Sequence, residues 1–450
     1  MSSDGRDLIG LGQKVASAAE PGEQVEAFVA RGSSTSVRVH GGEVESLTQA
    51  GSSGVGVRVV RDGRQGFAWA GSLDDDVVAE TLAEARDNAA FAEPDDAVGL
   101  PEPSEQPPPD IDLWRDEMAA LSTDRKVEMA LELEARVLAG DRRISGVRTA
   151  SWGDGVGEAA VVSSTGIEVW GRSTGCHLAV SAMAEQGDET KTGFGVSVGR
   201  SQSDVDVAEA AADAVDRATR LLGSVQPSSG TVTLVLDARM AATILGIVGG
   251  MLNGESVLKG RSPFAERMGE EIAAPAFTVV DDPTDPESLG ADSHDGEGLP
   301  TRPVPLIVDG RLNAFLHNTY TARRANTVST ASAVRGYRST PSVGPQALAL
   351  TPGSGSLDEL VAGVDHGLLV QSMTGLNSGV NATSGDFSVG AEGLMIRDGR
   401  LAEPIREATI ASTLQRLLLD VRAVGGEREW TPGGTGAAPL VIDGVTLSGS

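Results

Sequence analysis

A glycine-rich apolar segment just past the middle of the chain, Arg239–Gly260, most constrains how this sequence can fold. Apolar residues recur there at helical spacing, so the segment is predicted to be one helix, entered from a strand at Thr231–Asp237. The segment also contains the glycines Gly246, Gly249, Gly250 and Gly254. Each glycine in a helix interior costs about 0.5–1 kcal/mol relative to alanine. A close backbone approach or the wall of a cavity would account for that cost.

The segment is too short and too closely flanked by charge to span a membrane, which takes about 20 apolar residues. The chain has a formal net charge of -28, which disfavours nucleic acid and anionic membrane surfaces as partners. Its one cysteine, Cys176, cannot form a disulfide framework within the chain, and this favours a reducing compartment. The N-terminal sequence lacks the basic and apolar regions of a secretion signal. We therefore expect a cytoplasmic protein.

The pattern of strands and helices predicts an α+β protein with two domains. Residues 1–224 are expected to form antiparallel sheets flanked by helices, with a proline- and acid-rich linker at residues 93–109. The turn formers at residues 225–230 mark a boundary. Residues 225–450 are expected to form a mixed β-sheet domain with glycine-rich loops.

Short apolar runs in the N-terminal half predict separate strands on either side of glycine- and serine-rich segments. These strands are Val25–Ala30, Ser36–His40, Val44–Ala50, Gly54–Arg61, Val147–Ser151 and Glu158–Ser163. In the C-terminal half, a helix is predicted at Glu407–Val421.

Two parts of the N-terminal half echo each other. Gly66–Gly71 precedes an alanine-rich helix, and Gly193–Val198 precedes a second one with similar spacing. Each half would then be a set of strands ending in a helix. Either a duplication or a shared composition would account for this similarity.

The side chains that carry chemistry do not form a self-contained site. No two of the five histidines have the spacing of a helical metal pair. The acidic loop of residues 281–298 does not fit a calcium-binding pattern. Cys176 and His177 are neighbours in a predicted strand, so they point to opposite faces, and a buried structural cysteine is expected.

Several motifs, in the same order along the chain, resemble the TldD/PmbA family. They include DGEGLPTR at Asp295–Arg302, LIVDGRLNAFL at Leu306–Leu316, SGDF at Ser384–Phe387 and the glycine-arginine hairpin Gly54–Trp69. The chain is more specifically similar to the PmbA (TldE) branch. The resemblance covers most of the sequence.

This resemblance implies a two-part architecture and a heterodimer with a TldD-like subunit that carries zinc on a His-Glu-x-x-x-His helix. In this chain, Leu245, Gly246 and Gly250 occupy the positions of those ligands and of the glutamate. None of these side chains can bind zinc or act as a general base. The resemblance therefore implies that this subunit has no catalytic residues and no cofactor of its own. Small or unfolded peptides would be processed at zinc in the partner.

Five charged residues are candidates for binding a peptide or for lying at the subunit interface: Asp295, Glu297, Arg323, Arg324 and Asp386. Ion pairs and turn formation within the chain are the alternative roles for these residues. Two other functions stay open. One is an autonomous hydrolase that uses Asp295 and Glu297 with His317 or Asp386, and the other is a purely structural, self-associating protein.

Overall fold

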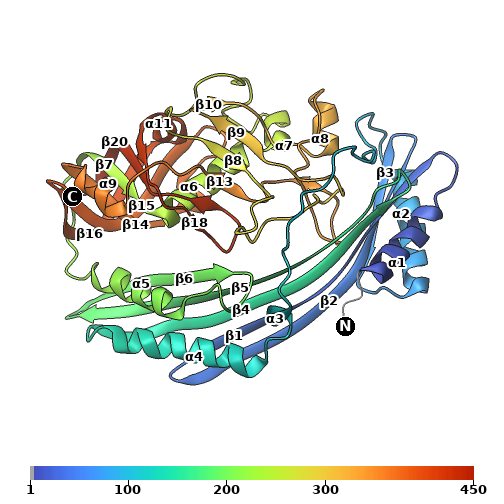
Figure 1. Cartoon of the computed structure of the whole chain (residues 1–450). Helices are drawn as coiled ribbons and strands as arrows, with labels where there is room; N and C mark the ends of the chain where they lie inside the picture. The colour runs from blue at the N-terminus through green and yellow to red at the C-terminus, as the bar shows by residue number, and fades with distance from the viewer. Residues whose placement is uncertain (1–4, 450) are drawn as a thin grey trace.

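The computed structural model describes residues 5–449, and the ends of the two expected domains, at residues 1–4 and 450, lie outside that range. Residues 6–219 form a long curved sheet with its helices, called here the N-terminal sheet (Figure 1). Residues 230–448 form the remaining sheets and lie over one face of it. The expected α+β fold class is confirmed, whereas the boundary at residue 225 stays a prediction. Within residues 5–449, no helix has the length and apolar character needed to cross a membrane.

The N-terminal sheet has the strand order β3-β2-β1-β4-β5-β6, and all neighbouring strands are antiparallel. Its strands are β1 (Glu23–His40), β2 (Glu43–Arg61), β3 (Arg64–Ala70), β4 (Ile144–Ser163), β5 (Glu168–Gln186) and β6 (Glu189–Gly199). Its helices are α1 (Arg6–Ser17), α2 (Asp75–Phe91), α3 (Asp116–Ala119), α4 (Thr123–Gly140) and α5 (Val207–Thr219). Apart from the short α3, the order helix, three strands, helix occurs twice. The echoed sequences lie in matching places in that order, at β3–α2 and at β6–α5.

Two hydrophobic cores lie at opposite ends of this sheet. One forms where α1 and α2 pack against β1, β2 and β3, and the other where α4 and α5 pack against β4 and β5. Cys176 is buried in the second core, as predicted. Burial raises the pKa of its thiol to about 12, so the thiolate is disfavoured.

A band of glycine and serine crosses the sheet between these cores. Gly32 of β1 is aligned with Ser52 of β2 and with Gly157 of β4, and Gly155 is aligned with Gly175 of β5. The prediction of separate strands on either side of this band is wrong, because β1, β2 and β4 each run through it without interruption. Their backbone ladder continues across residues that lack the alternating apolar side chains on which strand prediction depends.

The C-terminal half contains one sheet that closes on itself, called here the closed sheet. Its order is β16-β15-β14-β7-β20-β17, and β16 also pairs with β20. The strands are β7 (Gly230–Leu236), β14 (His366–Thr374), β15 (Asp386–Arg397), β16 (Arg400–Thr413), β17 (Val421–Val424) and β20 (Leu440–Ser448). β7 and β14 are parallel and the other pairs are antiparallel, so the predicted mixed sheet is confirmed.

A second sheet in this half has shorter strands, in the order β10-β9-β8-β13-β19-β18. These are β8 (Val279–Asp281), β9 (Val304–Val308), β10 (Arg311–Leu312), β13 (Leu348–Leu350), β18 (Glu429–Trp430) and β19 (Gly436–Ala437), and a separate pair consists of β11 (Ala333–Val334) and β12 (Ser342–Val343). The helices are α6 (Ala238–Met251), α7 (Gly254–Leu258), α8 (Thr319–Arg324), α9 (Leu357–Ala362), α10 (Leu376–Gly379) and α11 (Leu414–Leu419).

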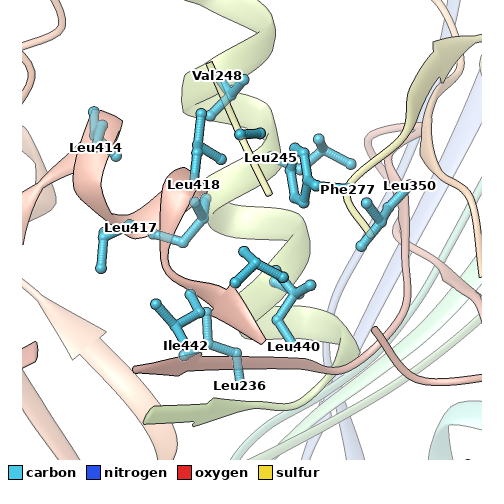
Figure 2. Close-up of a cluster of buried hydrophobic side chains, with 14 of the residues drawn as sticks. Leu236, Leu245, Val248, Phe277, Leu350, Leu414, Leu417, Leu418, Leu440 and Ile442 are labelled. Atoms are coloured by element: carbon cyan, nitrogen blue, oxygen red, sulfur yellow. The ribbon is translucent and has the colours of Figure 1, made fainter. Parts of the chain in front are cut away.

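Helix α6 packs its apolar face into the core between the two C-terminal sheets. Asp237 begins the helix by accepting a hydrogen bond from the Met240 N–H at 2.9 Å. Leu245 and Val248 then lie among side chains that include Phe277 (Figure 2). The helix is therefore anchored by a cap at its start and by burial along one side.

Two helix predictions in this half need correction. The single helix expected at Arg239–Gly260 is two helices, because Asn253 ends the first segment and caps α7 through the Glu255 N–H. The helix expected at Glu407–Val421 is correct only from Leu414 to Leu419. Residues before it belong to β16, whose pairing with both β15 and β20 outweighs the helical pattern.

Candidate functional site

The outer face of α6 is open at two of its glycines. Gly246 and Gly250 are exposed, and a Cβ added to either would meet no other group within 4 Å. Gly249 faces inward instead, and a Cβ there would lie 2.6 Å from the Leu348 side chain. Leu245 is buried, with 2% of its surface exposed. Close packing therefore accounts for Gly249, while Gly246 and Gly250 leave a bare surface on the helix.

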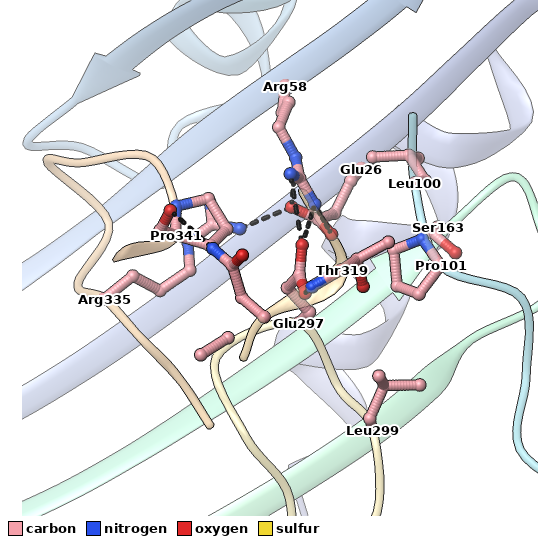
Figure 3. Close-up of polar contacts among 12 residues, drawn as sticks. Glu26, Arg58, Leu100, Pro101, Ser163, Glu297, Leu299, Thr319, Arg335 and Pro341 are labelled. Carbon is pink, nitrogen blue, oxygen red and sulfur yellow. Dashed lines mark hydrogen bonds and ion pairs between the residues drawn. The ribbon is translucent and has the colours of Figure 1, made fainter. Parts of the chain in front are cut away.

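Four buried charged side chains join the two halves of the chain, forming what we call the interdomain ion cluster (Figure 3). It consists of Glu26 on β1, Arg58 on β2, Glu297, and Arg335 in the loop after β11, and each is at most 4% exposed. Arg58 Nη2 lies 2.8 Å from one Glu26 oxygen and 3.4 Å from Glu297 Oε1. Arg335 also donates to Glu26. Two positive and two negative groups thus balance in a site that water does not reach.

The two arginines of this cluster keep the Glu26 carboxylate ionised. Burial acts to raise the pKa of Glu26, but Arg58 and Arg335 hold that pKa below its ordinary value. Glu297 also accepts a hydrogen bond from the Thr319 N–H at 2.9 Å. The predicted site residue Glu297 thus joins the domains within the chain, and its carboxylate is engaged on both oxygens.

Asp295, two residues earlier, stabilises the loop that carries Glu297. Its carboxylate accepts backbone hydrogen bonds from Glu297, Leu299 and Ala333 at 2.9–3.1 Å. Burial and the nearby negative charge of Glu297 raise its pKa. Asp295 therefore shapes the loop that Glu297 needs in order to reach Arg58.

The paired arginines at the end of α8 hold the linker of residues 93–109. Arg323 donates to the carbonyl oxygens of Ala97 and Leu100, the latter at 2.8 Å. Arg324 forms an ion pair with Asp95 at 2.9 Å. Both side chains thus contact the N-terminal half of the same chain.

Asp386 lies apart from these contacts, at the exposed start of β15. It accepts a hydrogen bond from the Ser384 hydroxyl at 2.6 Å. His317 is buried and its ring lies 3.1 Å from the Thr321 hydroxyl. The structure therefore brings Asp295 and Glu297 together but leaves Asp386 away from them.

Sequence reasoning did not single out Glu26 or Arg335 for this interface, and it treated Asp281 only as part of the acidic loop of residues 281–298. Asp281 on β8 is buried and accepts hydrogen bonds from the N–H groups of Gln346 and Ala347. Burial raises its pKa to about 7. For Glu26, a charge inside the apolar strand predicted at Val25–Ala30 was the available signal, since a buried charge needs a partner.

Comparison with known proteins places the chain in a family. The PmbA/TldA metallopeptidase C-terminal domain matches residues 229–449, domain 1 matches residues 25–89 and the central domain matches residues 116–222. Metalloprotease PmbA of Escherichia coli O157:H7 is 26% identical over 428 residues, covering 94% of this chain and 91% of that protein. The crystal structure of TldE from Thermococcus kodakarensis superposes with a TM-score of 0.88 at 25% identity, covering 99% of both chains. The chain belongs to the PmbA/TldE branch of the TldD/PmbA family.

A further structure, from Bacteroides thetaiotaomicron, has a TM-score of 0.89 and 26% identity, and the match covers 100% of both chains. The similarity to the PmbA/TldE fold thus extends along the whole of this sequence.

The family is one of metallopeptidases, so the α6 positions can be tested for their fit to zinc. Leu245, Gly246 and Gly250 offer no nitrogen, oxygen or sulfur ligand. Across residues 5–449, no group of three or more His, Cys, Asp and Glu side chains is arranged to hold a metal ion. The side chains present do not fit a zinc site.

Proposed function

We propose that this chain is the zinc-less subunit of a two-subunit metallopeptidase. It would pair in the cytoplasm with a TldD-like subunit that carries zinc and would help that subunit to process or degrade small or unfolded peptides. This chain would contribute a wall of the substrate chamber and contacts to the extended peptide. The chemistry of peptide cleavage would take place on the partner.

The observation that carries this proposal is the outer face of α6. The helix retains its cap and its buried apolar side, so it is well packed without a metal. At the positions where a TldD-like helix would bear ligands, Leu245 is buried in the core while Gly246 and Gly250 present bare backbone to the outside. A bare helix face allows another backbone, from a partner or a peptide, to approach closely.

The positions of Asp295 and Glu297 favour this role over that of an autonomous hydrolase. A general acid or base must reach the substrate with the group that transfers the proton. The Glu297 carboxylate is occupied by Arg58 and by the Thr319 N–H, and the Asp295 carboxylate by three backbone N–H groups. Both carboxylates are better placed to fix the domains than to meet a substrate.

The proposal is tested by producing this chain alone, a TldD-like chain with the His-Glu-x-x-x-His motif alone, and both together. We expect the two chains to co-elute as one species in size-exclusion chromatography with light scattering. We expect cleavage of an unfolded peptide to require both chains and to be lost on treatment with a chelator. Cleavage by this chain alone that resists chelators would instead support the autonomous hydrolase.

A matched pair of variants tests whether the α6 face is used in the complex. Gly250→Trp places a large side chain on the open face, and Phe91→Trp places one at a surface residue of the N-terminal half that is 90% exposed. We expect Gly250→Trp to reduce complex formation or cleavage at least tenfold while Phe91→Trp has little effect. Equal behaviour of the two variants would remove this face from the proposed role.

A further inference from the structure

A cavity of about 600 Å³ lies between the two halves of the chain, at the end of the N-terminal sheet far from the interdomain ion cluster. Its walls include the last part of β6, the side of α5, the start of α6 and strand β18. Both β6 and β18 are the final strands of their sheets, so each has one edge without a neighbouring strand. Residues from two edge strands therefore line one cavity.

The edge of β6 that lines the cavity carries backbone groups without partners. The Phe194 carbonyl oxygen accepts a hydrogen bond from Arg239 at 2.7 Å, and this contact indicates that the oxygen points away from β5. Backbone groups alternate in direction along a strand, so Val196 and Val198 also direct their N–H and C=O groups outward. Among residues 5–449, these outward groups have no hydrogen-bond partner.

The side chains of this part of β6 place glycines toward α5 and valines toward the cavity. Gly193 and Gly195 face α5, where an added Cβ would lie 2.2 Å and 1.9 Å from backbone oxygens of the helix. Val196 and Val198 consequently face the opposite side, where they are half-buried and line the cavity with Trp430. The cavity thus offers an apolar wall next to unpaired backbone donors and acceptors.

The charges in the cavity favour a basic ligand. Its arginines are already engaged: Arg217 with Asp213 and Asp237, Arg239 with Asp213, Arg200 with backbone carbonyls, and Arg115 with Asp112. Glu209 and Glu429 also line the cavity, and their carboxylates have no ion-pair or hydrogen-bond partner among residues 5–449. The carbonyl contacts of Arg200 leave its positive charge in place, but Asp204, Glu209 and Glu429 all line the cavity without an ion-pair partner among residues 5–449. The excess charge of the lining is therefore negative.

We propose that this cavity binds an extended peptide segment as an additional strand on the edge of β6. The peptide backbone pairs with the outward groups of Val196 and Val198, an apolar side chain packs against these valines and Trp430, and a lysine or arginine lies near Glu429. Backbone pairing gives affinity that is largely independent of sequence, and the carboxylates add a preference for basic residues. The inference rests on the proposed function in taking a peptide as the substrate, and it assigns that peptide a place on this subunit.

Fluorescence anisotropy with the full-length chain tests the site directly. The probe is a fluorescein-labelled peptide of alternating valine and threonine with one lysine, compared with its glutamate counterpart and with a copy N-methylated at alternate peptide bonds. We expect N-methylation to weaken binding at least tenfold, since it removes the peptide's donors to the strand edge. We expect the lysine peptide to bind about threefold to tenfold more tightly than the glutamate peptide, and Glu429→Gln to reduce that ratio. Equal binding of the methylated and unmethylated peptides would overturn the inference.

Proline substitutions provide a matched test on the protein side. Val196→Pro removes an outward N–H without removing a bond of the β5–β6 ladder, and edge strands tolerate proline at such positions. Thr192→Pro removes an N–H of the same direction on the same strand, at a residue that does not line the cavity. We expect Val196→Pro to weaken binding about fivefold to tenfold and Thr192→Pro to leave it unchanged. Equal effects of the two prolines would contradict the site.

Failure of this site and failure of the proposed function are distinguishable. If the chain and its TldD-like partner cleave peptides together but Val196→Pro changes neither Kd nor KM, the subunit role stands and the β6 site is wrong. If Val196→Pro weakens peptide binding by the chain while no complex with a TldD-like subunit forms, the site stands and the partner role is wrong.

Discussion

The two ends of the N-terminal sheet meet the C-terminal half in different ways. At the β1–β2 end, the interdomain ion cluster is buried, with Glu26 at 0% and Glu297 at 1% exposure. At the β6 end, ion pairs such as Arg217–Asp237 connect the halves, but a cavity of about 600 Å³ remains between them. A buried cluster fixes the position of one domain on the other, whereas a cavity lined by strand edges leaves room for a ligand. The two halves of the chain are therefore docked at one end of the sheet, and the proposed ligand site lies at the other end.

The largest expected effect comes from breaking the buried end. Glu26→Gln leaves the guanidinium groups of Arg58 and Arg335 buried without their shared carboxylate, which we expect to lower the free energy of unfolding by about 3–5 kcal/mol. Urea unfolding measures this loss. The control Glu271→Gln removes a pair with Arg311 in which both side chains are more than half exposed, and it should cost less than about 1 kcal/mol. Similar losses in the two variants would show that the cluster does not dock the domains.

A second prediction concerns the pH dependence of stability that arises from Asp281, inside the C-terminal half. The pKa of Asp281 is about 7 in the folded protein, against about 3.9 for an unperturbed aspartate. The folded state therefore binds more protons between these values, and the free energy of unfolding falls as pH rises from about 4 to 7. Asp281→Asn keeps an acceptor for the Ala347 N–H and should flatten this decline, by an amount on the order of 2 kcal/mol. Urea midpoints at pH 5 and pH 7.5 measure the change.

The control for Asp281→Asn is Asp398→Asn, in an exposed turn where a positive φ also suits asparagine. This variant should retain the pH dependence of the parent chain. A decline that persists unchanged in Asp281→Asn would assign the proton to another group.

The smallest expected effects separate the two faces of α6. Gly250→Ala adds a methyl group in open space and should raise the free energy of unfolding by about 0.5–1 kcal/mol. Gly249→Ala gains the same helix propensity but pushes against Leu348, so it should be neutral or destabilising. Thermal unfolding of the two single variants measures the difference. Stabilisation of similar size in both would mean that Gly249 is not closely packed.

The parts of the fold with a local pattern could be predicted from the sequence. The apolar spacing of α6 and the order of strands and helices in each half were sufficient for the fold class and the mixed C-terminal sheet. The uninterrupted passage of β1 through Gly32 and its neighbours could not be predicted, because pairing with β2 and β4 stabilises it. The same holds for residues 407–413, which have a helical pattern but pair with two strands.

The sequence was sufficient to select the charged residues of the candidate site, but it did not show which groups they contact. Asp295 and Glu297 stood out as charged groups in a family motif, and Arg323 and Arg324 as a pair of adjacent arginines. Nothing local revealed that Glu297 meets Arg58, a residue 239 positions away in the chain. The open edge of β6 also depends on long-range structure, since a strand becomes an edge only when no other strand pairs with it.

The central claim is that α6 has retained its packing without a metal and that zinc belongs to the partner. Its most direct test is the metal content of the purified chain and of its complex with a TldD-like subunit, measured by inductively coupled plasma mass spectrometry. We predict less than about 0.1 zinc per molecule in the isolated chain and about one zinc per complex, lost when the partner's histidines are substituted. One zinc per molecule of the isolated chain, retained through dialysis, would contradict the account.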